Sequence, residues 1–247
     1  MRLGGARVPS DSNQAEIAAG HGYYDNVNPT LLDLVRTDAT RICEFGCGGG
    51  ALARAVRKKL GSDIHYVGIE LMGDALARAG AALDVAVQCD LDGAADWSNH
   101  PQLNQALPLA HFDHAIFGDV LEHLYNPKQV LAQAAKRLRP GGTVLVCVPN
   151  VQHWSVFAQL VKGSWPQADA GLFDRTHLRW FTLTDMATLL NEVGLVVEKV
   201  VPRVFDAERG RAVMQQLRPL AEMLGVNADH LSDRGLPLQY VFVASVA

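Results

Sequence analysis

A glycine-rich turn near position 46 constrains the fold of this chain more than any other feature. Residues 44–50 read EFGCGGG, directly after Arg41-Ile42-Cys43 and directly before the helix-forming run ALARAV at 51–56. This order predicts a strand, a tight turn and the first turn of a helix. Such a turn offers backbone N–H groups and the positive end of a helix to an anionic group. We therefore expect a ligand site at this turn.

The acid at position 44 helps to choose the ligand. A glycine loop alone leaves the choice open, because the same residues fit a dinucleotide fingerprint with Ala51 in the third small position. A carboxylate at Glu44, two places before the first glycine, would repel a pyrophosphate lying on the loop. It suits a ligand that carries an ammonium beside its carboxylate. The methionyl end of S-adenosylmethionine (SAM) has this charge pattern, and we expect SAM here.

Four later segments extend the pattern through most of the chain. They read IHYVGIE at 64–70, VAVQCDL at 85–91, FDHAIFGDVLEHL at 112–124 and RPGGTVLV at 139–146. Together with the glycine loop, and in this order, they resemble the motifs of the class I SAM-dependent methyltransferases. The resemblance implies that Glu70 accepts hydrogen bonds from both ribose hydroxyls and that Asp90 and Leu91 hold adenine. It also implies that Gly118 and Asp119 lie at the cofactor.

The expected cofactor site draws on every one of these segments. Cys47 contributes its backbone, and Tyr24 covers the site from the N-terminal side. The full set of expected SAM contacts is Tyr24, Glu44, Gly46, Cys47, Gly48, Gly50, Glu70, Leu71, Asp90, Leu91, Gly118 and Asp119.

Apolar strands that alternate with helices predict a parallel sheet covered on both faces. We expect strands at 41–45, 64–70, 84–88, 113–118, 143–148, 195–204 and 238–246. We expect helices at 30–35, 49–60, 73–82, 127–138, 151–162, 184–193 and 207–224. The resemblance implies an α/β, Rossmann-like, doubly wound and mostly parallel seven-stranded sheet. Its last strand is antiparallel, between the fifth and the sixth, and helical segments lie N-terminal and on the acceptor side.

We expect a single domain over residues 1–247, because no linker or low-complexity run divides the chain. Residues 1–12 are small and polar, which indicates disorder. The segments 151–181 and 206–236 lie outside the shared core and are predicted to form lids on the acceptor side. A dehydrogenase would need a second substrate domain, for which the chain has no room.

Composition bounds the partners and the location. The chain is 49% hydrophobic and 19% charged with a net charge of −4, so it offers no general basic face for nucleic acid. It has no apolar signal core and no window of about 20 apolar residues that would span a membrane. We therefore expect a cytoplasmic protein. No cysteine pair has zinc-site spacing and no carboxylate trio has magnesium-site spacing, so we expect no metal.

The remaining motifs suggest the acceptor. YYDNVNP at 23–29, PNVQHW at 149–154 and DRTHLRWFT at 174–182 occur together with GDVLEHL at 118–124. This combination resembles a bacterial methyltransferase subgroup that is associated with cell-surface glycan clusters and is sometimes fused to glycosyltransferases. The resemblance implies a small-molecule or glycan-precursor acceptor, with a second copy of the chain or a glycosyltransferase as candidate partners.

Methyl transfer to a hydroxyl is helped by a general base that removes the hydroxyl proton. Histidine suits this role because it titrates near neutral pH. His123, after the fourth core strand, and His177, in the 174–182 motif, are the candidates. We expect a metal-independent O-methyltransferase. Two alternatives stay open, namely N-methylation of a small amine or sugar amine and a SAM-binding partner protein without turnover. A DNA amino-methyltransferase is disfavoured, because the fourth strand is not followed by an Asn/Asp-Pro-Pro-Tyr string.

Overall fold

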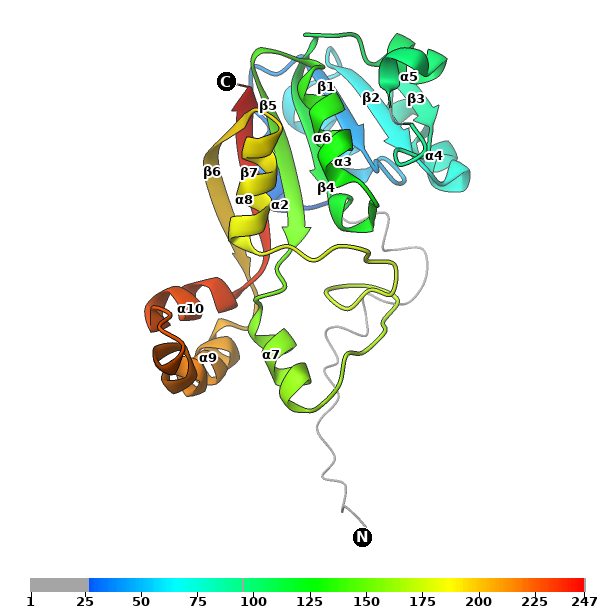
Figure 1. Ribbon diagram of the computed structural model, residues 1–247. Coiled ribbons are helices and arrows are strands. Elements are labelled where there is room, and N and C mark those ends of the chain that lie inside the picture. Colours follow the sequence, from blue (N-terminus) through cyan, green and yellow to red (C-terminus); the bar gives the residue numbers. More distant parts are fainter. Residues whose placement is uncertain (1–26, 95, 247) are drawn as a thin grey trace.

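The structure is a computed structural model that describes residues 27–94 and 96–246 (Figure 1). Its seven-stranded sheet has the order β3-β2-β1-β4-β5-β7-β6. The five core strands are parallel and comprise β1 (Arg41–Phe45), β2 (His65–Glu70), β3 (Val85–Gln88), β4 (Phe112–Gly118) and β5 (Leu138–Pro149). The strand β7 (Pro237–Val246) lies antiparallel between β5 and β6 (Leu195–Val204). The predicted fold and the antiparallel position of the last strand between the fifth and the sixth are confirmed.

Helices cover the sheet on both sides because alternate residues of each strand are apolar toward opposite faces. On one face, Ile42 and Ile116 pack with α2 (Pro29–Leu34), α3 (Ala51–Leu60) and α4 (Gly73–Ala79). On the other face, Cys43 and Phe117 pack with α6 (Pro127–Ala135) and α8 (Leu183–Glu192). The two apolar layers are what a doubly wound sheet requires.

Most predicted boundaries differ from the observed ones by a few residues, for local reasons. The helix α3 begins at Ala51 because Gly50 has a left-handed conformation. The helix expected at 127–138 ends at Ala135, since Leu138 already pairs with Phe112 and begins β5. The helix expected at 73–82 stops at Ala79 and continues as a separate 3₁₀ turn, Gly80–Ala82. The helix α7 (Trp154–Val161) starts later than expected because His153 caps it.

Two short helices were not predicted. The helix α5 (Pro101–Ala106) follows a 3₁₀ turn, Trp97–Asn99, and is capped by the His100 side chain. The helix α10 (Ala228–Gly235) is capped by Asn227 and packs against α9 (Ala207–Met223). Both are too short for apolar periodicity to mark them.

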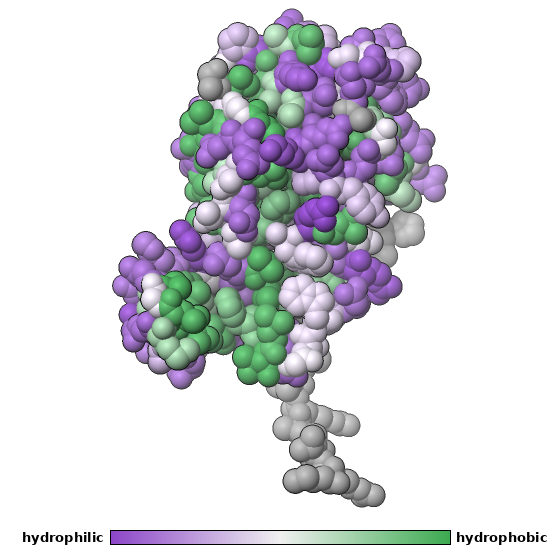
Figure 2. Space-filling model, viewed as in Figure 1, coloured by the Kyte–Doolittle hydropathy of each residue, from purple (hydrophilic) through white to green (hydrophobic). Residues whose placement is uncertain are grey.

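The segments outside the shared core gather beyond the carboxyl end of β5 (Figure 1). They comprise α7, the irregular loop 162–182, and the pair α9 and α10. Apolar side chains are prominent on this part of the surface (Figure 2). Within the described chain, no helix is long and apolar enough to cross a membrane. The disorder predicted for 1–12 and the contact predicted for Tyr24 lie outside the described residues.

Candidate active site

The glycine loop joins β1 to α3 and lies against two neighbouring strands. Gly46, Gly48 and Gly50 all have positive φ, at 69°, 51° and 77°. This conformation favours glycine, because a residue with a Cβ is strained there. The Gly46 N–H donates to the Ile69 carbonyl at 2.8 Å, which ties the loop to β2. A Cβ added at Gly46 would overlap Cγ2 of Val120, so the loop also touches the turn that follows β4.

Glu70 is held at the end of β2 by two backbone donors. Its Oε2 accepts from the Gly48 N–H and its Oε1 from the Met72 N–H, both at 2.9 Å. The carboxylate is therefore fixed beside the loop, while each oxygen keeps a further lone pair. Next to it, Leu71 and Met72 are 57% and 54% exposed. The carboxylate can accept hydrogen bonds from two hydroxyls of a ligand, and the exposed side chains beside it can contact an apolar ring. That this ligand group is the ribose of SAM stays a prediction.

Glu44 has a partner that the sequence did not reveal. Its side chain is buried on β1 and accepts a hydrogen bond from the Tyr66 hydroxyl on β2 at 2.8 Å. Burial raises the pKa of this carboxyl to about 8, although the Tyr66 hydrogen bond acts in the opposite direction. A largely neutral acid repels a pyrophosphate less than the charge argument assumed. Its contact with SAM stays a prediction.

The remaining predicted cofactor residues follow β3 and β4. Asp90 is exposed and accepts from the Asp92 N–H at 3.0 Å, and Leu91 is buried. Asp119 comes directly after Gly118, has a positive φ of 56° and accepts from the Gln239 side-chain amide. Burial raises the pKa of Asp119. The structure thus attaches Asp119 to β7, a contact that sequence reasoning missed.

Parallel registry brings these residues to one edge of the sheet. Phe45 lies opposite Ile69 and Phe117, so β1, β2 and β4 end side by side. Glu70 lies opposite Gln88, which brings the end of β3 to the same edge. Ligands of open α/β sheets bind at the carboxyl ends of the strands, where the order of the strands reverses. The glycine loop on β1 lies at that point.

His123 lies in the turn after β4, and its hydrogen bonds fix its tautomer. Its Nδ1 lies 3.0 Å from Thr176 Oγ1 and 3.3 Å from the Thr176 carbonyl oxygen. The Thr176 hydroxyl donates its own hydrogen to Asp174 at 2.7 Å, so toward His123 it accepts. Both neighbours of Nδ1 are acceptors, and the proton of the neutral ring is therefore on Nδ1. The lone pair is on Nε2.

The second predicted histidine lies against the first. The His177 ring is 4.8 Å from the His123 ring, and its Nε2 is 4.0 Å from Oε1 of Glu122. Glu122 and His177 are both buried. Burial raises the pKa of Glu122 well above its usual value and lowers the pKa of His177. Glu122 was not among the predicted site residues, although it is adjacent to His123 in the sequence.

Backbone hydrogen bonds attach the loop 162–182 to this turn. The Glu122 carbonyl accepts from the N–H groups of Leu178 and Arg179 at 2.8 and 3.0 Å. The 174–182 motif is therefore part of the candidate site, as expected of an acceptor-side segment.

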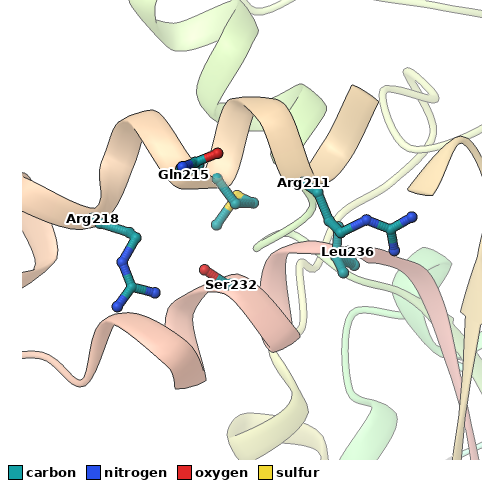
Figure 3. Close-up of a pocket in the computed structure, with 6 residues that line it drawn as sticks. Arg211, Gln215, Arg218, Ser232 and Leu236 are labelled. Carbon is teal, nitrogen blue, oxygen red and sulfur yellow. The ribbon is translucent and has the colours of Figure 1, made fainter. Parts of the chain in front are cut away.

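A separate pocket of about 370 Å³ lies between α9 and α10 (Figure 3). Its lining comes from those two helices and the residue after α10, and comprises Arg211, Met214, Gln215, Arg218, Ser232 and Leu236. None of the predicted cofactor or catalytic residues that the structure describes contributes to it. This pocket is therefore not the site at the carboxyl edge of the sheet.

Comparison with known proteins decides the family. A model of a methyltransferase domain family matches residues 16–200. The chain belongs to this methyltransferase family. The methyltransferase is 26% identical over 218 residues to a ubiquinone biosynthesis O-methyltransferase of Thiobacillus denitrificans, covering 80% of this chain and 89% of the relative. It is also 29% identical over 134 residues to the 27-O-demethylrifamycin SV methyltransferase of Amycolatopsis mediterranei, covering 49% and 47% of the two chains.

The fold agrees with solved methyltransferase structures. A SAM-dependent methyltransferase from Archaeoglobus fulgidus superposes with a TM-score of 0.59 at 15% identity, over 95% of this chain and 99% of that one. The residues at the carboxyl edge fit SAM. The N-cap of α3 is Gly50, which has no side chain to bond the first-turn N–H groups, so these donors can meet a carboxylate. The protein is a SAM-dependent methyltransferase.

Proposed function

We propose that this methyltransferase transfers a methyl group to a hydroxyl of a small molecule. The single observation that carries the proposal is the group of Glu122, His123 and His177 beside the glycine loop. Their ligand atoms all lie within 4.8 Å of one another. The free lone pair of His123 Nε2 belongs to this group, because Nδ1 is engaged by Thr176.

The chemistry of the acceptor explains why this group favours O-methylation. SAM supplies a methyl carbon that is already activated by its sulfonium. A hydroxyl must still lose its proton, whereas an amine need only be neutral. A histidine whose tautomer is fixed with its lone pair on Nε2, next to a buried carboxyl and a second histidine, suits the removal of a proton from a hydroxyl. Nothing in N-methylation requires such a group.

Aromatic side chains support a ring-shaped acceptor. On the loop that carries His177, the Trp165 ring lies 5.3 Å from the Phe173 ring and 5.8 Å from the Trp180 ring. Trp165 and Trp180 are 38% and 44% exposed. Exposed aromatic faces stack on phenols and on sugars alike. The names of the two relatives favour a phenol or another small-molecule hydroxyl, and the sequence motifs favour a glycan precursor.

The predicted location and partners belong to the same proposal. All four cysteines are buried and unpaired, which suits the reducing cytoplasm. A second copy of the chain or a glycosyltransferase remains the proposed partner. The SAM contacts assigned to the residues at the carboxyl edge are proposals too.

The first experiment tests the cofactor residues. Glu70→Gln removes one carboxylate acceptor and introduces a donor, so we expect SAM affinity to fall by about 2–4 kcal/mol, the range for hydrogen bonds to charged groups. Calorimetric titration measures this, with Asp74→Asn on exposed α4 as the matched control. Equal SAM affinity in Glu70→Gln and the wild type would remove Glu70 from the site.

The second experiment tests the acceptor. Release of S-adenosylhomocysteine is measured with catechols and other phenols, nucleotide sugars and small amines. We expect hydroxyl acceptors to react, and His123→Ala to lower kcat by at least about tenfold without changing SAM affinity. His230→Ala, on the exposed surface of α10, is the control. Turnover of amines with no turnover of any hydroxyl acceptor contradicts O-methylation.

A further inference from the structure

Glu122, His123 and His177 have the composition of a metal site. The sequence predicted no metal, because no cysteine pair and no carboxylate trio has metal-site spacing. That reasoning did not consider this group, of which two residues are adjacent and the third lies on a distant loop. The fold brings one ligand atom of each within 4.8 Å of the others. We propose that these three side chains hold one divalent transition-metal cation, with Zn²⁺ as the best fit, and that the cation binds the acceptor hydroxyl. The second part rests on the proposed function.

The spacing is close to that of a bound zinc site. Zinc lies about 2.0–2.2 Å from nitrogen and oxygen ligands, which places tetrahedral ligand atoms roughly 3.3–3.5 Å apart. The Glu122–His177 distance is 4.0 Å. Closing the site therefore needs side-chain shifts of roughly 1 Å or less. His123 is only half-buried and is therefore less confined by packing than Glu122 and His177.

The buried carboxyl of Glu122 supplies a second, independent observation. The side chain of Glu122 is 1% exposed, and its Oε2 has no hydrogen-bond partner among the residues that the structure describes. Buried polar atoms of native proteins almost always have a partner. A bound cation would give Oε2 the partner that it lacks.

The surroundings of His123 are those of a metal ligand. Metal-binding histidines usually donate their other ring N–H to a carbonyl, a carboxylate or a similar acceptor, which orients the ring. His123 does so through Nδ1, toward the hydroxyl and the carbonyl of Thr176. Asp174 in turn accepts from that hydroxyl. Thr176, itself bonded to Asp174, thus orients the ring and leaves Nε2 as the nitrogen available to a cation.

The ligand set selects the metal and its role. Two imidazoles and one carboxylate suit zinc and other transition metals, whereas Mg²⁺ prefers oxygen ligands. Three protein ligands leave a fourth position open, as in catalytic zinc sites. A hydroxyl oxygen bound there becomes more acidic. Its proton passes to water, the oxygen bonds to the methyl carbon, and the carbon–sulfur bond breaks with its electron pair remaining on sulfur.

Metal binding can be measured without the acceptor. Untagged protein is stripped with a chelator and titrated with Co²⁺, followed by its visible absorption, and with Zn²⁺ against a chromophoric chelator. We expect one cation per chain. We expect Glu122→Gln, His123→Ala and His177→Ala each to weaken binding at least 100-fold. His230→Ala should bind as the wild type does. Circular dichroism checks that each variant folds. His123→Ala is the variant least expected to disturb folding, because His123 is only half-buried.

Methyl-transfer assays separate this inference from the proposed function. Loss of turnover on stripping and its recovery with Zn²⁺ support the metal role. The metal site is overturned if the protein does not bind one cation per chain, or if a folded His123→Ala variant binds the cation as tightly as the wild type. A histidine acting as a general base would then be the remaining explanation. Full activity of the stripped enzyme overturns the role of the cation. If the cation binds specifically but no hydroxyl acceptor is methylated, the metal site stands and the proposed O-methylation is overturned.

Discussion

Glu44 is an acidic side chain buried on β1, directly before the glycine loop. In the sequence it is an acid beside a glycine loop, and its charge favours SAM over a pyrophosphate. In the structure it is buried on β1 and hydrogen-bonded to Tyr66. Burial penalises the charged form, so the pKa of Glu44 rises from 4.5 to about 8. The proton on this carboxyl is therefore coupled to folding.

The coupling has a definite sign. Between pH 4.5 and about 8, the folded protein holds a proton on Glu44 that the unfolded chain has lost, so the stability from this group is present at low pH and falls as pH rises. The slope approaches about 1.4 kcal/mol per pH unit at most within that window. Glu44→Gln cannot ionise, so its free energy of unfolding should depend less on pH. Urea unfolding from pH 5 to 8 measures both proteins.

The control for this pH prediction is Asp33→Asn, which changes an exposed acid on α2. It should follow the wild-type pH dependence. Parallel curves for Glu44→Gln and the wild type would mean that Glu44 ionises in the folded protein as it does in the unfolded chain.

At the scale of elements, the sequence predicted best the strands that are buried on both faces of the sheet. The strands β1, β2 and β4 are buried along nearly their whole length, and their predicted bounds agree with the structure to within one residue. Helix ends were less accurate, because they depend on conformations such as the left-handed Gly50. The short helices α5 and α10 rest on side-chain caps rather than on apolar periodicity.

The candidate site could be predicted only in part, for a similar reason. Residues that follow strand ends share one edge of a parallel sheet, so the glycine loop, Glu70 and Asp119 could be placed together from the sequence. The meeting of His177 with Glu122 depends on the path of an irregular loop. That path is fixed by backbone hydrogen bonds from Leu178 and Arg179, which no sequence pattern shows.

The contact between the glycine loop and the β4 turn gives a prediction for these two elements. Gly46→Ala should destabilise the fold, because its Cβ would overlap Val120 and its positive φ alone costs about 1–2 kcal/mol for an L-residue. Val120→Ala removes the overlapping methyl group. We expect the double variant to lose less stability than the sum of the single losses, by about 0.5–3 kcal/mol. Chemical denaturation of all four proteins measures this coupling.

Strictly additive losses would contradict the proposed contact and leave backbone strain as the whole effect. Gly194→Ala provides a comparison, since Gly194 has a positive φ of 79°, close to the 69° of Gly46, but a Cβ there meets no atom within 4 Å of its described surroundings. Its cost should be that of strain alone.

At the scale of the whole molecule, the sheet and the additional segments differ in how they are held. The central strands are buried between two helical layers. The pair α9 and α10 buries only a few residues, among them Met214 and Ala221, and leaves Met223 and Leu224 75% and 65% exposed. Elements with few buried contacts open at lower free energy than a core does. We therefore expect α9 and α10 to open independently of the sheet.

Hydrogen exchange with and without SAM tests this division together with the position of the cofactor site. Without ligand, amides of β1, β4 and β5 should exchange most slowly, and those of α9 and α10 much faster. At 100 times its Kd, SAM adds about 2.7 kcal/mol to openings that disrupt its site, which slows exchange there about 100-fold. The slowing should include the Gly48 amide, bonded to Glu70, and spare α9 and α10. Strong protection of α9 and α10 with none at the glycine loop would place SAM elsewhere.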